Sequence, residues 1–379
     1  MNRLTTPWGE CELTRFPEDP RDQLRAWDAA DEYLLNHLAG LDPSGTVAVV
    51  GDRWGALVTS LAALAPVQIS DSYLGQRATR ANLARAGATG VTLLTTRDTP
   101  PERVDVLLVR VPKSLALLED QLHRLAPALH ADTLVIGTGM VKEVHTSTLR
   151  LFERIVGPTR TSLAVKKARL IFATPDPALT PGPSPWPYAY DLPADAPAPV
   201  AGLTVTNHAG VFCADRLDIG TRFLLGHLPG PGAPGRRIAD LGCGNGVVGL
   251  AAALTDPGAE LLFVDESHQA VASAEATFLA NAPRGAKAEF RIGDGLADEP
   301  PGSLDVVLNN PPFHSHQATT DATARRMFTD ARRALRPGGE LWVVGNRHLG
   351  HHGTLRRLFG NCRLVASDPK FVVLKAVKR

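Results

Sequence analysis

A short polar and proline-rich segment, Asn309-Asn310-Pro311-Pro312-Phe313, directly follows the apolar run 304–308. Two consecutive prolines lack backbone N–H groups and fix φ, so they cannot continue a central strand. They can instead hold an amide and backbone carbonyls rigidly at the carboxyl edge of a sheet, where open α/β folds bind ligands. The Asn310 side-chain oxygen and the Pro311 carbonyl are two acceptors suited to a flat, weakly nucleophilic amine. Phe313 could stack on its ring, contributing about 1–3 kcal/mol. We therefore interpret Asn310, Pro311 and Phe313 as catalytic residues that would methylate a planar amino group by positioning and electrostatics.

A glycine-rich loop supplies the second chemical signal. The segment Asp240-Leu241-Gly242-Cys243-Gly244-Asn245-Gly246 follows a strand-like run and precedes the helical run 247–254. Closely spaced glycines let the backbone approach a ligand, and a helix N-terminus offers free N–H groups. The spacing of Gly244, Gly246 and Gly249 also satisfies the dinucleotide fingerprint, so a nicotinamide cofactor is an alternative. Asp240 would repel a pyrophosphate but suits an ammonium group, which favours S-adenosylmethionine. Asp240, Gly242, Gly244, Asn245 and Gly246 are thus predicted to bind the cofactor.

Two further aspartates end predicted strands. Asp265 could accept hydrogen bonds from both ribose hydroxyls, or it could instead cap a helix over 267–280. Asp294, in Gly293-Asp294-Gly295, could accept from an adenine amino group, or it could simply belong to a turn. We predict cofactor contacts for both residues.

Alternating strand-like and helical patterns predict α/β units with parallel sheets that position these residues. At 379 residues, two domains are expected. The composition divides the chain into a domain over 1–174, an extended Pro-rich linker over 175–200 and a domain over 201–379. In the second domain we predict strands at 237–241, 260–265, 288–292, 305–309, 340–344 and 370–376, with a closing antiparallel hairpin.

The two halves look like copies of each other. Three pairs of segments match in the same order and with similar spacing: 47–55 with 238–246 after a one-residue slip, 69–72 with 264–267, and 104–113 with 304–313. Three matches in order indicate duplication. The first copy has Val49 in place of the loop aspartate and Arg53 in place of its central glycine, with Trp54 beside it. It should therefore bind no cofactor.

Composition narrows the class of protein. The formal net charge is +1, so no overall basicity indicates a nucleic-acid partner, although a local basic patch remains open. Neither a signal segment nor a membrane-spanning apolar run is found in the sequence, and we expect no membrane partner. Four dispersed cysteines favour neither disulfides nor a metal site and suit a reducing cytoplasm. Two tandem domains make a monomer the expected state.

The sequence resembles class I S-adenosylmethionine-dependent methyltransferases that modify planar amino groups. It is most similar to the bacterial ribosomal RNA guanine-N2 methyltransferases, which carry a catalytic C-terminal domain and a degenerate N-terminal copy. The motifs that carry this resemblance span most of the chain: 111–119, 166–170, 207–212, 217–221, 240–246, 263–267, 310–314, 345–349 and 371–377. The N-terminal motifs resemble the large-subunit member more than its small-subunit relative. The resemblance implies tandem Rossmann-like domains and methyl transfer to guanine N2 in 23S rRNA, with Asn310 at the reacting amine.

The same resemblance implies that the first copy holds RNA. Basic residues in it are candidates for phosphate contacts: Arg110, Lys113, Lys142, Lys166, Lys167 and Arg169. Arg110 and Lys113 stand where the second copy has Asn310 and Phe313. Ordinary surface charge or a structural domain contact is the alternative for each of them.

Other activities remain open at this point. The same Asn-Pro-Pro-aromatic edge could methylate small-subunit 16S rRNA, a protein glutamine or an adenine amine. A nicotinamide-dependent oxidoreductase and a non-catalytic RNA-binding factor belong to different classes.

Overall fold

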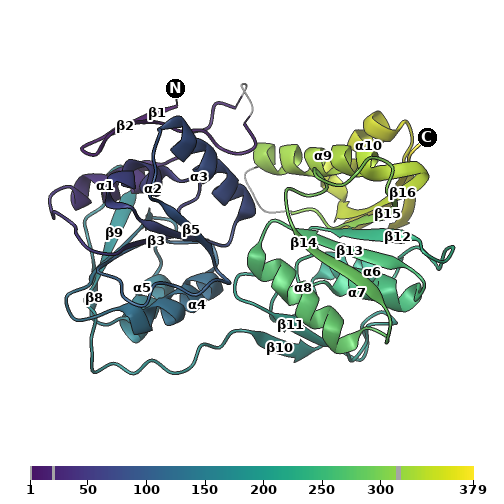
Figure 1. Cartoon of the computed structure of the whole chain (residues 1–379). Helices are drawn as coiled ribbons and strands as arrows, with labels where there is room; N and C mark the ends of the chain where they lie inside the picture. Colours follow the sequence, from purple (N-terminus) through teal and green to yellow (C-terminus); the bar gives the residue numbers. More distant parts are fainter. Residues whose placement is uncertain (1, 19–21, 313–316) are drawn as a thin grey trace. The chain divides into compact units, whose positions relative to one another are not determined.

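The computed structural model describes residues 2–18, 22–312 and 317–379, and for 317–321 it describes the backbone alone. The chain forms two compact units, Met1–Trp186 and Pro187–Arg379, each with its own seven-stranded sheet (Figure 1).

The C-terminal unit is built on a mostly parallel sheet with the strand order β14-β13-β12-β15-β16-β18-β17. Only the pairings of β18 with β16 and β17 are antiparallel. Its strands are β10 (Tyr188–Asp191), β11 (Thr204–Asn207), β12 (Arg237–Leu241), β13 (Glu260–Asp265), β14 (Lys287–Ile292), β15 (Leu304–Asn309), β16 (Leu335–Asn346), β17 (Arg363–Ser367) and β18 (Phe371–Val377). Its helices are α6 (Ile219–Leu225), α7 (Val247–Thr255), α8 (His268–Asn281), α9 (Gln317–Ala334), η3 (Arg347–Leu349) and α10 (His351–Phe359).

The N-terminal unit repeats this topology with the order β5-β4-β3-β6-β7-β9-β8. Its strands are β1 (Arg3–Thr6), β2 (Gly9–Glu12), β3 (Val47–Val50), β4 (Val67–Ser70), β5 (Thr92–Thr95), β6 (Val106–Arg110), β7 (Leu134–Met140), β8 (Thr159–Thr161) and β9 (Ala168–Ala173). Its helices are α1 (Ala29–Leu38), α2 (Ala56–Ser60), η1 (Ala62–Leu64), α3 (Tyr73–Arg85), α4 (Leu115–Leu125), η2 (Ala126–Ala128) and α5 (Thr146–Ile155). The predicted duplication is confirmed at the level of strand order.

Strand registers align the two copies residue by residue. Val49 lies opposite Leu108 in the first sheet, and Asp240 lies opposite Leu308 in the second. Counting along β6 and β15 from these pairs, Arg110 occupies the position of Asn310. The substitutions inferred from the sequence therefore fall at the same edge of the same sheet.

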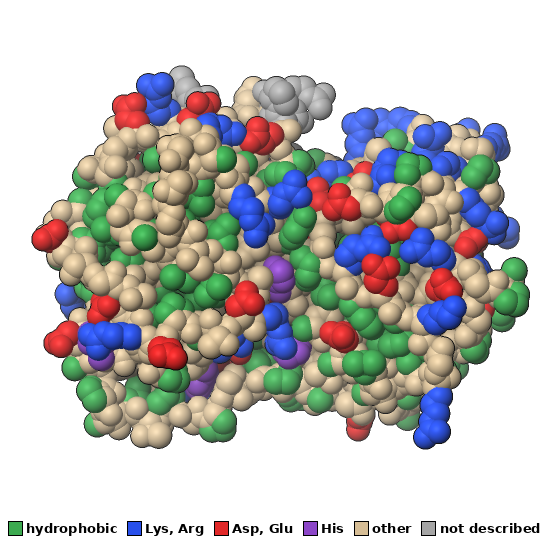
Figure 2. Space-filling view, in the orientation of Figure 1, with side chains coloured by type: hydrophobic (Ala, Val, Ile, Leu, Met, Phe, Trp, Pro, Cys, Tyr) green, Lys and Arg blue, Asp and Glu red, His purple; other side chains and the backbone are tan. Residues whose placement is uncertain are grey.

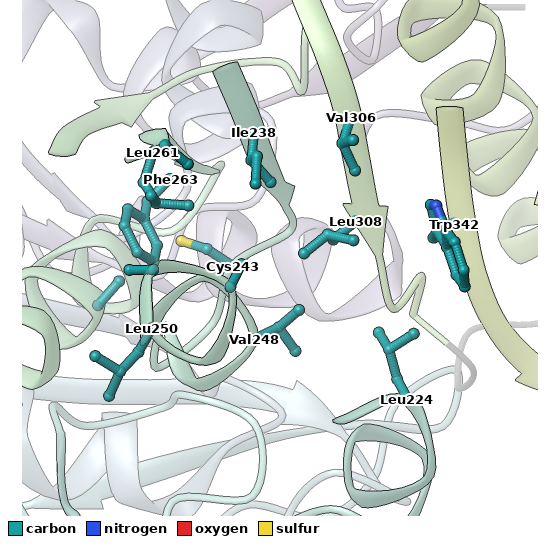
Figure 3. Close-up of a cluster of buried hydrophobic side chains, with 14 of the residues drawn as sticks. Leu224, Ile238, Cys243, Val248, Leu250, Leu261, Phe263, Val306, Leu308 and Trp342 are labelled. Atoms are coloured by element: carbon teal, nitrogen blue, oxygen red, sulfur yellow. The ribbon is translucent and has the colours of Figure 1, made fainter. Parts of the chain in front are cut away.

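Two apolar layers sandwich the second sheet. On one face, Leu224 of α6 and Val248 of α7 pack against Ile238 and Leu308 in one buried cluster (Figure 3). The other face packs against α9 and α10 through a second cluster that includes Phe328 and Leu355. Because strands buried on both faces are mostly apolar on both sides, β13 and β15 contain continuous apolar runs, 261–264 and 306–308.

The boundaries differ most from the predictions in two places, and those of β14, β15 and β18 differ by one residue. The predicted linker over 175–200 ends near residue 187, because β10 pairs with β11 and Leu192, Ala196 and Val200 are buried against α6 and α7. Strand β16 starts at Leu335 rather than at 340, since Leu335 pairs with Leu304 ahead of an irregularity in the ladder. The closing antiparallel hairpin, β17 with β18, is confirmed.

Candidate active site

The glycine loop joins β12 to α7 through three residues with positive φ, Gly242, Gly244 and Gly246. A Cβ on Gly246 would lie 2.7 Å from the Ala274 backbone of α8, so this glycine is required for packing. At Gly244, by contrast, a Cβ would meet nothing within 4 Å. The loop therefore turns its central backbone toward open space, as a ligand cradle requires.

Asp240 lies beneath this loop and is 3% exposed. Its carboxylate accepts a hydrogen bond from the Gly249 N–H in the first turn of α7, at 2.8 Å. Burial raises the pKa of Asp240 to about 8. Its structural role at the helix N-terminus is thus shown, and its predicted contact with a cofactor ammonium stays a prediction.

Asp265 ends β13 beside the loop. One carboxylate oxygen accepts from Gly244 N–H and the other from Ser267 N–H, both at 3.0 Å. Ser267, and not Asp265, caps α8. Asp265 is therefore fixed beside the glycine loop, and its predicted contact with the ribose hydroxyls stays a prediction.

Asp294, after β14, forms an ion pair with Arg326 of α9 at 2.9 Å. This contact brings α9 to the same edge of the sheet. The predicted contact of Asp294 with adenine must coexist with this ion pair.

Asn245, also predicted to bind the cofactor, donates its side-chain amide to Asn207 Oδ1 at 3.0 Å.

Asn310 lies at the end of β15 with its amide in a defined orientation. Its Nδ2 donates to Thr221 Oγ1 at 2.9 Å and approaches Asp218 Oδ2 at 3.5 Å. A carboxylate can only accept, so the NH₂ end must face Asp218. The opposite end, Oδ1, is buried and has no hydrogen-bond partner among the described residues.

An unpaired buried acceptor costs about 1–3 kcal/mol, and such atoms call for a functional explanation. Here the orphaned oxygen is the atom predicted to receive the substrate amine. Pro311, the second predicted acceptor, is buried beside it. Phe313 lies outside the described residues.

Asp218 and Thr221 were missed as contributors to the site. Asp218 caps α6, and its Oδ2 accepts from the Thr221 N–H at 2.8 Å. An Asp directly before a helical run is a common N-cap and signals a helix N-terminus in the sequence. Nothing in the sequence places that helix start against Asn310, 89 residues away.

The corresponding edge of the N-terminal unit is occupied by ion pairs. Arg110 is 0% exposed and binds Asp28, Asp31 and Glu143 at 2.7, 3.3 and 2.9 Å. Arg53, in place of Gly244, binds Asp28 and Glu143. Burial alone would raise the pKa of Glu143, but the neighbouring guanidinium groups of Arg110 and then Arg53 lower this pKa to about 2. The prediction that Arg110 contacts RNA phosphates is therefore wrong, because its guanidinium is enclosed and already neutralised.

In the N-terminal unit a different carboxylate, Asp52, binds the N-terminus of α2. Asp52 accepts from Gly55, Leu57 and Val58 N–H groups at 3.0–3.1 Å. Val58 occupies the position of Gly249, so Asp52 does from the loop what Asp240 does from the strand. Burial raises the pKa of Asp52 to about 7.

The remaining predicted RNA contacts differ in exposure. Lys113, Lys142, Lys166 and Lys167 are exposed, while Arg169 is half-buried. Lys166 forms an ion pair with Glu32 at 3.1 Å. Lys166 and Lys167 both adopt positive φ, +48° and +64°, in a tight turn. Non-glycine residues held this way are strained, which is common at functional surfaces.

Within the described ranges, no group of three or more His, Cys, Asp or Glu residues could hold a metal ion. No described helix is long and apolar enough to span a membrane.

The strand order, the open glycine loop and Asn310 at the neighbouring strand end define a tandem class I methyltransferase fold, with one equipped and one degenerate copy. The model for the RLMG N-terminal domain matches residues 1–177, and that for the methyltransferase small domain matches 202–375. Two curated relatives are named ribosomal RNA large subunit methyltransferase G. The one from Streptomyces griseus is 71% identical over all of both chains. The one from Streptomyces coelicolor is 74% identical over 99% of this chain and 100% of its own length. This chain belongs to the ribosomal RNA large subunit methyltransferase G family and is a methyltransferase.

A solved structure supports the fold independently. The T. thermophilus 16S rRNA N2 G1207 methyltransferase RsmC, described in complex with AdoMet and guanosine, superposes with a TM-score of 0.75 at 22% identity. The match covers 100% of this chain and 97% of that chain.

Proposed function

We propose that this chain transfers a methyl group from S-adenosylmethionine to the exocyclic N2 of a guanine in large-subunit ribosomal RNA. The observation that carries the proposal is the buried, unpaired Asn310 Oδ1, which is held toward the reacting edge by the bonds on its Nδ2. The names of relatives at 71–74% identity support ribosomal RNA of the large subunit as the substrate.

The residues beside the glycine loop fit S-adenosylmethionine. Gly244 leaves the backbone open, Asp265 lies within hydrogen-bonding distance of that backbone, and Asp240 supplies a carboxylate below it. When bound, the cofactor would supply an electrophilic methyl group on a sulfonium. Asp240 would hold its ammonium group, Asp265 its ribose hydroxyls and Asp294 its adenine amine.

Asn310 and Pro311 act on the nucleophile. The lone pair of an exocyclic guanine amine is delocalised into the ring, which makes the nitrogen weakly nucleophilic. If Asn310 Oδ1 and the Pro311 carbonyl accept its two N–H groups, the nitrogen becomes more tetrahedral and its lone pair points at the methyl group. Most of the acceleration then comes from preorganised acceptors and alignment. The target base must be single-stranded or flipped to reach this edge.

The N-terminal unit contributes RNA binding rather than chemistry. Lys113, Lys142 and Lys167 are exposed and can reach phosphates, exposed Lys166 would exchange its pairing with Glu32 for a phosphate, and Arg169 is half-buried. Lys166 also lines a cavity of about 490 Å³ together with Arg3 and Arg25.

Each unit has its own hydrophobic core, and we propose that the protein acts as a monomer in the cytoplasm.

The decisive experiment combines the protein with labelled S-adenosylmethionine and separately purified large- and small-subunit rRNA, and then maps the labelled base. We expect label at one guanine N2 of the large-subunit RNA. Label in small-subunit RNA alone would support the rival rRNA substrate, and label confined to protein would overturn the proposal. Thermal shifts with S-adenosylmethionine and with NADH separately test the cofactor.

A further inference from the structure

Positive charge is concentrated in the last part of the chain. Residues 317–379 hold 13 lysines and arginines against 4 aspartates and glutamates, whereas the whole chain holds 40 against 39. Figure 2 shows Lys and Arg side chains gathered over the region where Figure 1 places α9 and α10. The nearly neutral net charge of the protein therefore conceals a strongly basic surface on the unit that carries Asn310.

Helices α9 and α10 pack against each other and against one face of the sheet. Their inward positions are apolar, with Phe328 and Leu355 fully buried. Their outward positions carry four exposed arginines: Arg325, Arg332, Arg356 and Arg357. We call these four residues the α9–α10 arginine face. Arg325 and Arg332 are seven residues apart and so lie on one side of α9, about 10 Å apart along its axis.

These arginines lack the carboxylate partners that other arginines of the unit have. Arg237 and Arg291 both pair with Glu299, and Arg236 pairs with Asp256. In the described part of the chain, no member of the arginine face forms an ion pair. Unneutralised like charges repel one another, and such a surface raises the local concentration of an anionic partner.

Helix α9 also reaches the loops of the active site. The Met327 methyl group would be 3.3 Å from a Cβ on Gly242, and Arg326 binds Asp294 at 2.9 Å. The segment η3 leaves β16 at the same carboxyl edge and carries exposed Arg347 and His348. Basic residues thus extend from the reacting edge outward along α9 and α10.

We propose that the α9–α10 arginine face binds the phosphate backbone of the substrate RNA next to the target guanine, so that the catalytic unit grips its own substrate. This inference rests on the proposed function, because it takes RNA as the substrate. It adds a binding surface to the one that we assign to the N-terminal unit. Arginine suits this role because its planar fork forms paired hydrogen bonds to phosphate oxygens.

The test compares two double charge reversals of equal size. Arg356→Glu/Arg357→Glu changes the face. The control, Arg284→Glu/Lys287→Glu, changes the loop after α8 and the first residue of β14 in the same unit, where Lys287 pairs with Glu260 at the surface. Binding to a large-subunit rRNA fragment is measured from 50 to 300 mM salt, together with steady-state methylation, cofactor affinity and thermal stability. A second face variant, Arg325→Glu/Arg332→Glu, guards against misfolding of the first.

Each phosphate contact to a single strand contributes a slope of about −0.7 in log affinity against log salt. Each face variant removes two such contacts, so we expect it to lose about 1.4 units of slope and tenfold or more in affinity. The KM for RNA should rise. The kcat at saturating RNA, the cofactor affinity and the thermal stability should all stay at their wild-type values. The control should keep its slope and its KM.

The outcomes distinguish this inference from the proposed function. If the wild-type protein methylates the RNA while face variants keep the wild-type slope and KM, the arginine face is not an RNA site and the proposed function stands. An equal loss in the control would also overturn the inference, since only total charge would then matter. A KM that rises only for assembled subunits, and not for naked RNA, would assign the face to a ribosomal protein instead. If the wild-type protein methylates no RNA, the proposed function fails irrespective of the variants.

Discussion

Replacing Asn310 with alanine should separate catalysis from stability. The variant loses Oδ1, the acceptor for the substrate amine, together with the bond from Nδ2 to Thr221. Loss of one preorganised polar group in an active site costs about 2.7–4 kcal/mol of transition-state stabilisation. We therefore expect kcat to fall by about 10²–10³, with the affinity for S-adenosylmethionine retained because Asn310 is not part of the glycine loop.

Replacing an ordinary buried asparagine with alanine lowers the free energy of unfolding, but replacing Asn310 should not. The lost bond to Thr221 contributes about 0.5–1.5 kcal/mol, whereas removing the unpaired Oδ1 relieves a desolvation cost of about 1–3 kcal/mol. The free energy of unfolding should thus stay unchanged or rise by up to about 2 kcal/mol. A change of that size would raise the Tm by no more than several degrees.

Asn361 provides the matched control. It is half-buried in the same unit, donates to the Phe359 and Val377 carbonyls and accepts from the Val377 N–H. Asn361→Ala should therefore lower stability by about 2–3 kcal/mol while keeping kcat. Single-turnover methylation measures the rate of methyl transfer, calorimetry measures stability, and cofactor titration measures the affinity for S-adenosylmethionine. The reasoning is refuted if Asn310→Ala is destabilised as much as the control, or if it keeps more than a tenth of wild-type kcat.

Three other predictions follow from the same contacts. Thr221→Val removes the main acceptor that orients the Asn310 amide, so kcat should fall about two- to tenfold with little change in KM or stability. Because the pKa of Asp240 is raised to about 8, this carboxyl is protonated at lower pH and must lose its proton to pair with an ammonium group. Cofactor affinity should therefore rise with pH up to about 8, and Asp240→Asn should bind more weakly with a flatter pH profile, as isothermal titration would show. Arg110→Ala leaves buried carboxylates without their partner, so the N-terminal unit should lose about 3–5 kcal/mol of stability, measurable by urea unfolding.

Clear outcomes would contradict each of these. Rate loss in Thr221→Val comparable to that of Asn310→Ala would show that the hydroxyl itself reacts or binds substrate. An unchanged pH profile in Asp240→Asn would remove Asp240 from cofactor binding. A stable Arg110→Ala that binds RNA more weakly than Lys113→Ala would restore Arg110 as an RNA contact.

The sequence predicts the architecture well where the signal is local. Strands buried on both faces are mostly apolar, and the sequence predicts β12 and β13 with their observed bounds. The duplication could also be predicted, because each landmark is a strand end followed by a distinctive turn. The Pro-rich composition predicts an extended linker through residue 200, but residues 188–200 are packed. There β10 pairs with β11, and three apolar side chains are buried.

The sites show where sequence reasoning stops. The sequence favours a phosphate contact for Arg110 over a structural one, because Asp28, Asp31 and Glu143 come from distant segments and meet it only in the fold. The contact of Asn310 with Thr221 is equally non-local. The α9–α10 arginine face was missed for a different reason. Its charge is visible in the sequence, but it was averaged away in the net charge of the whole chain.

The ion pairs that occupy the edge of the N-terminal sheet have a consequence for how the two copies respond to metabolite supply. A protein state is stabilised by any ligand that binds it, in proportion to the logarithm of ligand concentration above Kd. The C-terminal unit, with its open loop, depends on the methyl donor for part of its resistance to unfolding. The N-terminal unit carries its own charges in the equivalent place, and we expect its stability not to depend on the methyl donor. We therefore expect the stability of one unit to follow the concentration of S-adenosylmethionine and that of the other unit to be independent of it.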